Sequence, residues 1–340
     1  MWMLRAATGS TNIQNVLHRN RRSVSIENEE VRLTITVEGA NVAEILHKPT
    51  GVNPLWTPPW PASEPSAYAG AAHPEYGTSD EAPILSGIMG HSVCLDTYGT
   101  PSPEEFLAGV PVHWEASVIP YKVECDSTSV SLRGVLPKSQ LEFVRQIRLA
   151  PNGSVIHFEG SIIDLCHSDR LIAWTQHVVV GPPFLECGKT EFRTPVTRSR
   201  VIDSDFTQGR GLQKTGAEFQ DFLCPRKDTG FIDLRVFPDE TVSGGFTTHL
   251  LDTSKDQTFF VAWSGTSKLA FGYVWNRRDF PWLCRWEENH LRADPPWNGR
   301  TLACGMEFGF RPHWSHEEKW FKEALYSACQ PIAGLLQKLL

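Results

Sequence analysis

Polar and apolar side chains alternate along residues 31–37, with Val, Leu, Ile and Val at the odd positions and Arg, Thr and Thr at the even ones. Successive side chains of a β-strand point to opposite faces, so this alternation predicts a strand with one buried face. Gly39 predicts a turn, and residues 42–47 predict the strand that pairs with the first one.

Strand patterns continue to residue 311, and no helical period of ten residues interrupts them before residue 315. Closely spaced strands without helices favour antiparallel sheets, and therefore an all-β sandwich or barrel. No repeat of 20 to 50 residues stands out, which argues against a propeller. The predicted strands are 117–125, 128–136, 141–149, 153–164, 171–180, 231–237, 257–264, 268–276, 281–287 and 302–311.

Two segments interrupt this pattern. Residues 49–83 are rich in Pro, Gly, Ala and Ser, a composition that excludes a helix or a central strand. Residues 87–105 are also loop-rich. Long ordered loops often carry function, so both segments are candidates for the walls of a site.

The chain is expected to form one domain over residues 23–314, because a sandwich of this length can be a single unit. Residues 1–22 are polar and unpatterned and predict an N-terminal arm. Residues 315–340 predict a C-terminal helical tail whose polar face carries both charge signs. Packing of this tail on the sandwich or on a second subunit is favoured over a membrane surface, and a homodimer is compatible with that expectation.

Composition excludes several classes of function. The 340 residues carry a net charge of −7 and no basic run beyond residues 19–22, so nucleic acid and anionic membranes are poor partners. No apolar stretch is long enough to span a membrane, and the start has no signal-peptide core. The eight Cys form no C-x-x-C pair, which argues against a zinc ribbon or a thioredoxin-like site and favours free thiols in the cytoplasm.

Two histidines are candidates for chemistry. His177 lies in the predicted strand of "LIAWTQHVVVGPPFLE", beside small neighbours that leave space for a ligand. His113 precedes a predicted strand in "GVPVHWEA". Histidine serves as a general acid or base near neutral pH, although the pattern by itself favours a structural role for each of these residues.

Glu287 and Glu288 end an apolar strand in "PWLCRWEENH". Adjacent residues on a strand face opposite ways, so one carboxylate would enter a cleft while the other is solvated. A carboxylate beside tryptophan gains basicity through lost hydration, as a general base requires. Arg145 lies on the same face of its predicted strand as apolar residues, and a charged side chain there either is paired in the core or faces a cleft. His91 lies in a loop with glycines, where the backbone can approach a ligand. Both are candidate ligand contacts.

Other chemistries have little support in the sequence. The close pairs of metal-ligand type are His113 with Glu115 and His313 with His316, and neither completes a known ligand set. The sequence contains no G-x-S-x-G, no P-loop and no Rossmann glycines, so serine hydrolases, nucleotide hydrolases and dehydrogenases are not indicated.

In their order along the chain, several segments resemble the galactose mutarotase-like superfamily, which includes the aldose 1-epimerases. They are "VRLTITVEGANVAEILHKPTGVNPLW", "PVHWEA", "WTQHVVVGPPFL", "FGYVW" and "CRWEEN", and they span residues 24–312. The resemblance implies a large antiparallel supersandwich with a sugar on a concave sheet face.

The resemblance also implies roles for particular residues. Glu287 would be the general base on the C1 hydroxyl, with Glu288 as its rival, and His177 would protonate the ring oxygen. His113, His91 and Arg145 would hold hydroxyl groups. No metal or organic cofactor would be required. The aromatic candidates for stacking on the sugar are Trp56, Trp60 and Trp114.

The sequence departs from the family in three places. Trp114 stands where members usually carry glycine. The arginine that precedes the first family histidine is not evident, and "GIMGH" occupies its region with His91 as a substitute. The sugar-binding aspartate maps to "GGFTTHLLD", where His249 and Asp252 are the candidates.

Three functions therefore remain open. The first is an aldose 1-epimerase-like enzyme, a mutarotase. The second is a non-catalytic carbohydrate-binding protein, which the missing arginine and aspartate favour. The third is a phosphosugar epimerase on the same fold, which would need several arginines around the cleft. The available arginines are Arg193, Arg198, Arg200, Arg277 and Arg278.

Overall fold

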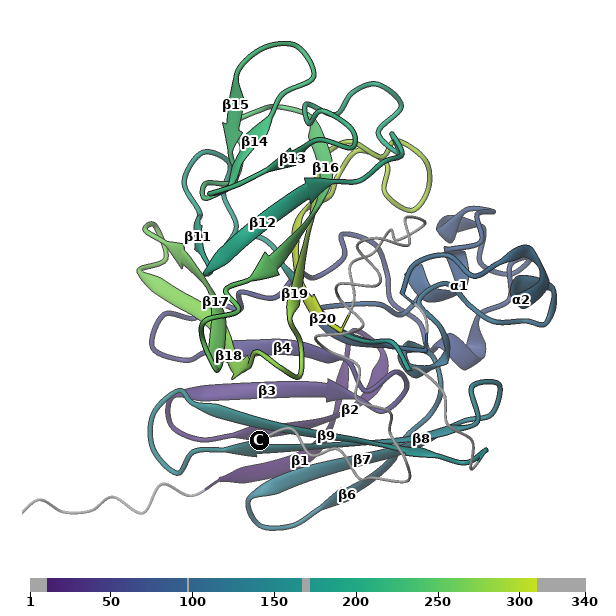
Figure 1. Ribbon diagram of the computed structural model, residues 1–340. Coiled ribbons are helices and arrows are strands. Elements are labelled where there is room, and N and C mark those ends of the chain that lie inside the picture. The colour runs from purple at the N-terminus through teal and green to yellow at the C-terminus, as the bar shows by residue number, and fades with distance from the viewer. Residues whose placement is uncertain (1–10, 97, 167–171, 311–340) are drawn as a thin grey trace, which may run out of the picture.

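The computed structural model describes residues 11–96, 98–166 and 172–310, and one large antiparallel sheet organises this part of the chain (Figure 1). Eleven strands lie in the order β1-β2-β3-β4-β5-β10-β20-β19-β16-β12-β13. Their bounds are β1 (Asn12–His18), β2 (Arg21–Glu27), β3 (Val31–Thr36), β4 (Val42–His47), β5 (His91–Leu95), β10 (Trp174–Val180), β12 (Val196–Val201), β13 (Glu218–Phe219), β16 (Ser243–Leu251), β19 (Trp282–Asn289) and β20 (Leu302–Gly309).

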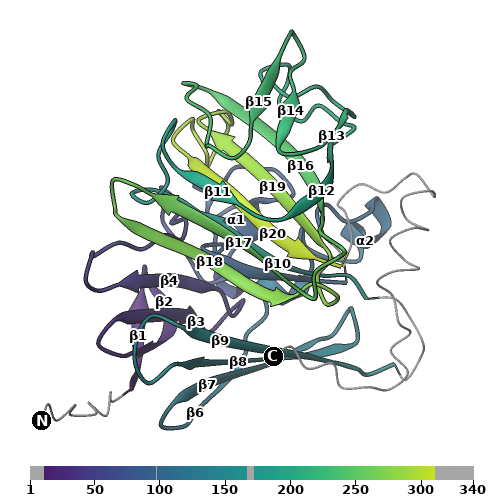
Figure 2. The same cartoon turned by 60° about the vertical axis from the view of Figure 1, so that its left-hand side comes forward.

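Smaller sheets pack against this large sheet, and the apolar side chains between them form the main core. One has four strands, β6 (Lys122–Cys125), β7 (Ser129–Leu136), β8 (Leu141–Leu149) and β9 (Ile156–Asp164). Another has three, β11 (Glu191–Arg193), β17 (Gln257–Ser264) and β18 (Leu269–Asn276), and it lies in front of β20 and β19 in Figure 2. A two-stranded ribbon joins β14 (Leu223–Pro225) to β15 (Phe231–Asp233).

The helical pieces lie on the side away from β17 and β18 (Figures 1 and 2). Ser102 and Glu105 form a capping box that begins α2, which satisfies backbone N–H groups at its first turn. The helices are α1 (Ala82–Leu85) and α2 (Pro103–Leu107), with 3₁₀ turns η1 (Pro65–Ala67), η2 (Pro74–Tyr76) and η3 (Glu115–Ser117). The Pro-rich segment, residues 49–83, forms a wall of loops without a strand of the large sheet, as its composition predicts, but it also contains two 3₁₀ turns and the start of α1, which the composition did not predict.

The central strands of the sheet are buried on both faces. In β10, Val178 and Val180 enter the main core, whereas Val179 joins a second apolar cluster on the other face. In β20, Met306 and Phe308 face the main core. Because side chains alternate along a strand, the odd-numbered residues of both strands face the loop wall.

The all-β antiparallel sandwich expected from the sequence is confirmed. Strands β4, β8 and β17 have the predicted bounds, and most of the other predicted strands differ by a few residues. Strands β5, β11, β12, β13, β14 and β16 were not predicted. The sequence of strand β16 is "SGGFTTHLL". Nearly every residue in it is buried, so polar and apolar residues do not alternate, and its glycine, threonine and histidine residues do not mark it as a buried strand.

The predicted N-terminal arm is wrong for residues 12–22, which form β1 and the start of β2 at the edge of the large sheet. The polar composition of this segment was misleading because polar side chains such as Arg21 are buried. The Arg21 guanidinium donates hydrogen bonds to the carbonyl oxygens of Gly87 and Glu38. It also forms an ion pair with Glu64. The predicted C-terminal helix over residues 315–340 lies outside the described residues.

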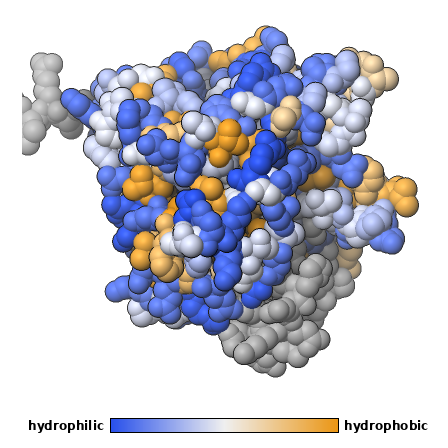
Figure 3. All heavy atoms as spheres, turned by 90° about the horizontal axis from the view of Figure 1, so that it is seen from above, coloured by the Kyte–Doolittle hydropathy of each residue, from blue (hydrophilic) through white to orange (hydrophobic). Residues whose placement is uncertain are grey.

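The surface seen from above in Figure 3 is mostly polar, and its apolar side chains occur in small separate groups. No helix in the described part of the chain is long and apolar enough to cross a membrane.

Candidate functional site

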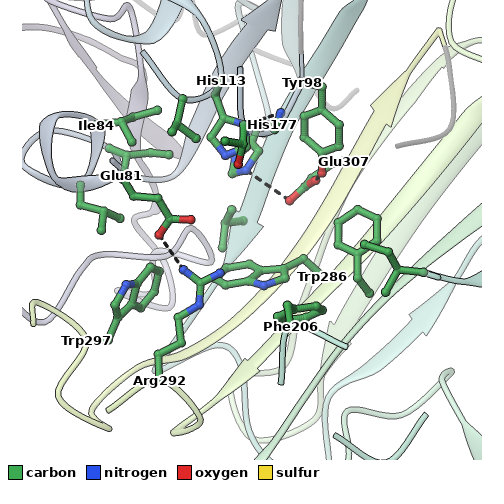
Figure 4. A pocket seen from close by; sticks show the side chains of 18 of the residues that line it. Glu81, Ile84, Tyr98, His113, His177, Phe206, Trp286, Arg292, Trp297 and Glu307 are labelled. Carbon is green, nitrogen blue, oxygen red and sulfur yellow. Dashed lines mark hydrogen bonds and ion pairs between the residues drawn. The ribbon is translucent and has the colours of Figure 1, made fainter. Parts of the chain in front are cut away.

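The side chains of His177 and Glu307 meet on the face of the sheet that carries the loop wall. Strands β10 and β20 are antiparallel neighbours, and Val179 pairs with Gly305. This register sets His177 across from Glu307, where side chains of two strands approach each other closely. Nε2 of His177 lies 3.3 Å from Oε1 of Glu307, as Figure 4 shows.

Burial disfavours the charged form of both groups. Burial lowers the pKa of His177 to about 4 and raises the pKa of Glu307 well above its ordinary value, because each ion would lose its hydration. A neutral imidazole with a protonated carboxyl holds one mobile proton, and so does an imidazolium with a carboxylate. Burial thus favours a neutral imidazole beside a protonated carboxyl, and transfer of that one proton from Glu307 to His177 gives the ion pair.

The phenol of Tyr98 contacts the other carboxyl oxygen. Its hydroxyl donates a hydrogen bond to Oε2 of Glu307. Its ring centroid lies 6.3 Å from that of His177 and 5.5 Å from that of His113. A donor to a carboxylate stabilises the ionised form, so Tyr98 opposes the effect of burial on Glu307.

Glycine at position 305 makes room for this carboxylate. Gly305 and Glu307 share a face of β20, and a Cβ added to Gly305 would lie 2.3 Å from Oε1 of Glu307. Any side chain here would displace the carboxylate from His177. The glycine thus shapes the site through steric space alone.

His113 enters the same space from the loop wall. Its backbone N–H donates to the carbonyl oxygen of Gly99 at 2.9 Å, and the Gly99 N–H donates to Nδ1 of His113 at 3.2 Å. Because Nδ1 accepts, a neutral His113 carries its hydrogen on Nε2. The centroids of the two imidazoles, His113 and His177, are 5.0 Å apart.

These groups line a cavity of about 330 Å³, within the range of small-molecule sites. An ion pair between Glu81 and Arg292, 2.8 Å apart, lies at the end opposite to the His177–Glu307 pair (Figure 4). The Arg292 guanidinium lies 4.6 Å from the ring centroid of Trp297. The cavity thus has two polar ends, with aromatic and aliphatic walls between them.

Glu287, the base predicted from the sequence, does not line this cavity, and its placement corrects that prediction. Its side chain leaves the opposite face of β19 from Trp286, which does line the cavity. Oε2 of Glu287 lies 2.9 Å from Nη1 of Arg285, and Oε1 accepts a hydrogen bond from Ser243 at 2.5 Å. Glu287 is therefore the counter-ion of a buried arginine.

Glu288, the alternative base, lies on the same face of β19 as Trp286, but its carboxyl group is bound by the turn that follows β19. Its Oε1 accepts hydrogen bonds from the backbone N–H groups of Leu291 at 2.7 Å and Arg292 at 2.9 Å. Oε2 of Glu288 lies 3.7 Å from Nε of Arg292. Burial raises the pKa of Glu288. This carboxyl holds Arg292 rather than a ligand.

His91 and Arg145 lie behind the sheet, away from the two imidazoles of the cavity, which corrects their predicted role as ligand contacts there. The His91 ring bonds to the Tyr273 hydroxyl and to Oε1 of Gln176, each at 2.8 Å. Arg145 donates to the same amide oxygen at 2.8 Å. Burial lowers the pKa of Arg145 to about 10 and that of His91 well below its ordinary value.

The remaining candidates divide between the cavity and the core. Trp56 lines the cavity, whereas Trp114 is buried against Ser139, to which its indole N–H donates. The backbone of Trp114 has a φ of 67°, a region that favours glycine. His249 is buried behind the sheet and bonds to Ser199 and Thr247, so it is not a cavity residue. Trp60 and Asp252 also do not line the cavity.

Sequence reasoning missed Glu307, Tyr98 and Arg292. Glu307 does carry a signal, since "CGMEFG" places one carboxylate between two glycines of the same parity in an otherwise apolar strand. Tyr98 and Arg292 lie in loops and have no periodic signal, because only the fold sets their neighbours.

Among the described residues, no group of three or more His, Cys, Asp or Glu side chains is arranged to hold a metal ion. The cavity itself offers two imidazoles and a carboxyl group that share space with a phenol. This combination is suited to moving protons at a hydroxyl-rich ligand.

Comparison with solved structures supports a galactose mutarotase-like β-sandwich as the fold of this chain. A candidate aldose 1-epimerase from Klebsiella pneumoniae superposes with a TM-score of 0.65 at 15% identity, covering 97% of this chain and 86% of that one. A galactose mutarotase-like protein from Clostridium acetobutylicum gives 0.60 at 13% identity, covering 97% of both chains.

A galactose mutarotase related enzyme from Lactobacillus acidophilus gives a TM-score of 0.57 at 12% identity, covering 93% of this chain and 95% of that one. No protein-family model matches the sequence, and no curated protein matches it significantly. At these identities the similarity establishes the fold alone. The galactose mutarotase-like fold expected from the sequence is confirmed.

Proposed function

We propose that this protein is an aldose 1-epimerase-like enzyme that binds a sugar in the cavity and interconverts its anomers. The observation that supports the proposal is the buried His177–Glu307 pair, 3.3 Å apart, with His113 beside it. Anomer interconversion needs one group to take a proton from the C1 hydroxyl and another to give one to the ring oxygen.

The single shared proton of the pair suits this reaction. With the proton on His177, the Glu307 carboxylate accepts the C1 hydroxyl proton while the imidazolium protonates the ring oxygen. The C1–O5 bond breaks to give the open aldehyde, and rotation about C1–C2 exposes the other face. Closure reverses both transfers, so the protein ends with its original proton. Each group would contribute about 10²–10⁴-fold to the rate.

Other residues would position the sugar. His113 would donate from Nε2 to a hydroxyl, because its Nδ1 is already engaged by Gly99. Trp286 and Trp56 line the cavity and would offer apolar surface to the C–H face of the ring. The reaction needs no metal or organic cofactor, since it consists of proton transfers and the opening and closing of the C1–O5 bond.

The proposal is tested by following the anomers of freshly dissolved α-glucose and α-galactose by polarimetry or NMR. The expected result is equilibration faster than the buffer rate and proportional to protein concentration. Equilibration at the buffer rate for every aldose tested would reject catalysis.

The second candidate is a sugar-binding protein without turnover. One observation favours it. Tyr98 contacts one oxygen of Glu307 and His177 contacts the other, so the carboxyl group has partners without a ligand. Such a protein would shift sugar signals without accelerating exchange. The phosphosugar alternative has less support, since Arg292 is the only arginine within the described residues that lines the cavity, and it is already paired.

A further inference from the structure

A second hollow adjoins the cavity and shares part of its lining. It has a volume of about 770 Å³, more than twice that of the first. Glu81, Phe206, Arg292 and Trp297 line both spaces. The Glu81–Arg292 ion pair therefore stands at the boundary between them, at the end of the first cavity that lies away from His177 and Glu307 (Figure 4).

An aromatic wall extends along the first cavity to this boundary. The ring centroid of Trp297 lies 6.0 Å from that of Trp286 and 6.1 Å from that of Trp56, both of which line the first cavity. The Arg292 guanidinium lies 4.6 Å from the Trp297 ring and 5.8 Å from the Trp286 ring. Indole faces and a planar guanidinium are surfaces on which successive sugar rings pack and form hydrogen bonds.

Charge at the boundary favours a neutral ligand. Arg292 faces the Glu81 carboxylate at 2.8 Å and the Glu288 carboxyl at 3.7 Å, so its positive charge is already compensated. The second hollow also contains one further arginine, Arg210, and one aspartate, Asp294. A phosphate group would find no surplus positive charge, whereas hydroxyl groups can share the existing donors and acceptors.

We propose that the substrate is the reducing end of a neutral oligosaccharide, whose first ring occupies the His177–Glu307 cavity and whose next ring extends past Trp297 into the second hollow. The orientation rests on the function proposed above, because only the reducing ring has a free C1 hydroxyl. The volume beyond the boundary, the aromatic and guanidinium surfaces at the boundary and the balanced charges all support a chain of uncharged rings rather than a single ring.

The test compares glucose with maltose and cellobiose, two disaccharides whose reducing ring is glucose. Anomer exchange is measured by NMR at equilibrium, and affinity is measured in parallel by calorimetry. We expect kcat/KM to be at least tenfold higher for one of the disaccharides than for glucose. Affinity should rank in the same order, so the subsite is tested even if exchange is not accelerated and the catalytic proposal fails.

Two variants narrow the second hollow from different loops. Ala293→Trp and Thr78→Trp place an indole at exposed positions that line the hollow. Each should lower the ratio of disaccharide to glucose, in kcat/KM or in affinity, at least tenfold. Ala71→Trp is the matched control, because Ala71 is exposed and lies outside both linings, and it should keep the wild-type ratio.

Several results would overturn the inference. One is a disaccharide preference at or below unity in both rate and affinity. Another is a wild-type ratio in both Ala293→Trp and Thr78→Trp. A preference for glucose 6-phosphate over glucose by tenfold or more would instead assign the space around Arg292 to an anionic substituent.

Discussion

Glu307 and Glu287 occupy neighbouring strands, yet their surroundings give them different tasks. Glu307 meets an imidazole and a phenol inside a cavity, while Glu287 neutralises a buried guanidinium behind the sheet. A carboxylate that compensates a buried charge stabilises the fold, because the unpaired ion would be costly. One that faces a cavity is available for proton transfer.

The first prediction separates these two carboxylates. Glu307→Gln should lower kcat for anomer exchange by about 10²–10⁴-fold while sugar affinity stays within a few-fold, since the amide keeps the shape but cannot accept the proton. Glu287→Gln should retain exchange and lower the free energy of unfolding by about 1–3 kcal/mol, measured by urea denaturation. Loss of exchange in Glu287→Gln alone would restore the base assigned from the sequence.

Tyr98 is predicted to set the alkaline limit of activity. Activity ends at high pH when the pair loses its shared proton. The Tyr98 hydroxyl stabilises the ionised carboxylate, so Tyr98→Phe should raise the pKa of Glu307 and move the alkaline limb of kcat upward by about one pH unit. Tyr121→Phe is the control, because Tyr121 is buried away from the site and donates to the Ala116 carbonyl oxygen. A downward shift would contradict this role.

Strand β20 positions the site because its side chains alternate between the main core and the cavity. Residues 304, 306 and 308 fill the main core, which fixes the strand in place, and residues 305 and 307 face the cavity. A slip of one residue would move Glu307 into the core. The register with β10 therefore decides whether His177 and Glu307 meet at all.

The space above Gly305 gives a prediction at this scale. Gly305→Ala would place a Cβ 2.3 Å from Oε1 of Glu307 and displace the carboxylate. We expect kcat to fall by about 100-fold, since a displacement of about 1 Å in a catalytic group has an effect of that size. Gly265→Ala is the matched control, because its nearest neighbour lies at 3.7 Å, in ordinary contact. Equal activity of both variants would remove the steric role of Gly305.

The whole molecule buries histidines on both faces of its large sheet, and this gives stability a pH dependence. Burial, followed by the charge of Arg285, lowers the pKa of His249 to about 3. Below pH about 6.5 the unfolded chain therefore binds a proton at His249, whereas the folded chain does not bind it until the pH approaches about 3. The stabilising contribution is complete above pH about 6.5 and is lost as the pH falls toward about 3.

We predict that His249→Gln removes this component. Between pH 6 and 4 the free energy of unfolding of the wild type should fall more steeply than that of the variant, by about 1.4 kcal/mol per pH unit. Denaturant titrations at several pH values measure the difference in slope. Glu307 has a raised pKa, so its protonation makes the folded protein more stable as the pH falls, which opposes the effect of His249. The test therefore compares the pH slope of the variant with that of the wild type, in which the Glu307 contribution cancels. Parallel slopes would show that His249 is protonated in the folded protein.

The sequence by itself determined the class of fold and named three of the cavity residues, His177, His113 and Trp56. Alternation of period two is local, so it marks strands such as β8 and β17 wherever one face is buried. It also placed His177 on a strand and, with the resemblance to known epimerases, singled out His113. The Pro-rich composition marked residues 49–83 as the loop wall without any knowledge of the sheet.

Only the tertiary structure decided which carboxylate stands beside His177. Glu287, the candidate from the sequence, and Glu307, which the sequence reasoning missed, both lie near the ends of apolar strands, and the choice between them depends on which face of each strand turns toward the loops. That choice is made by the pairing of β10 with β20 and β20 with β19, contacts between distant parts of the chain. Local patterns carry no information on such pairing, so the partner of the histidine emerges only when the sheet is assembled.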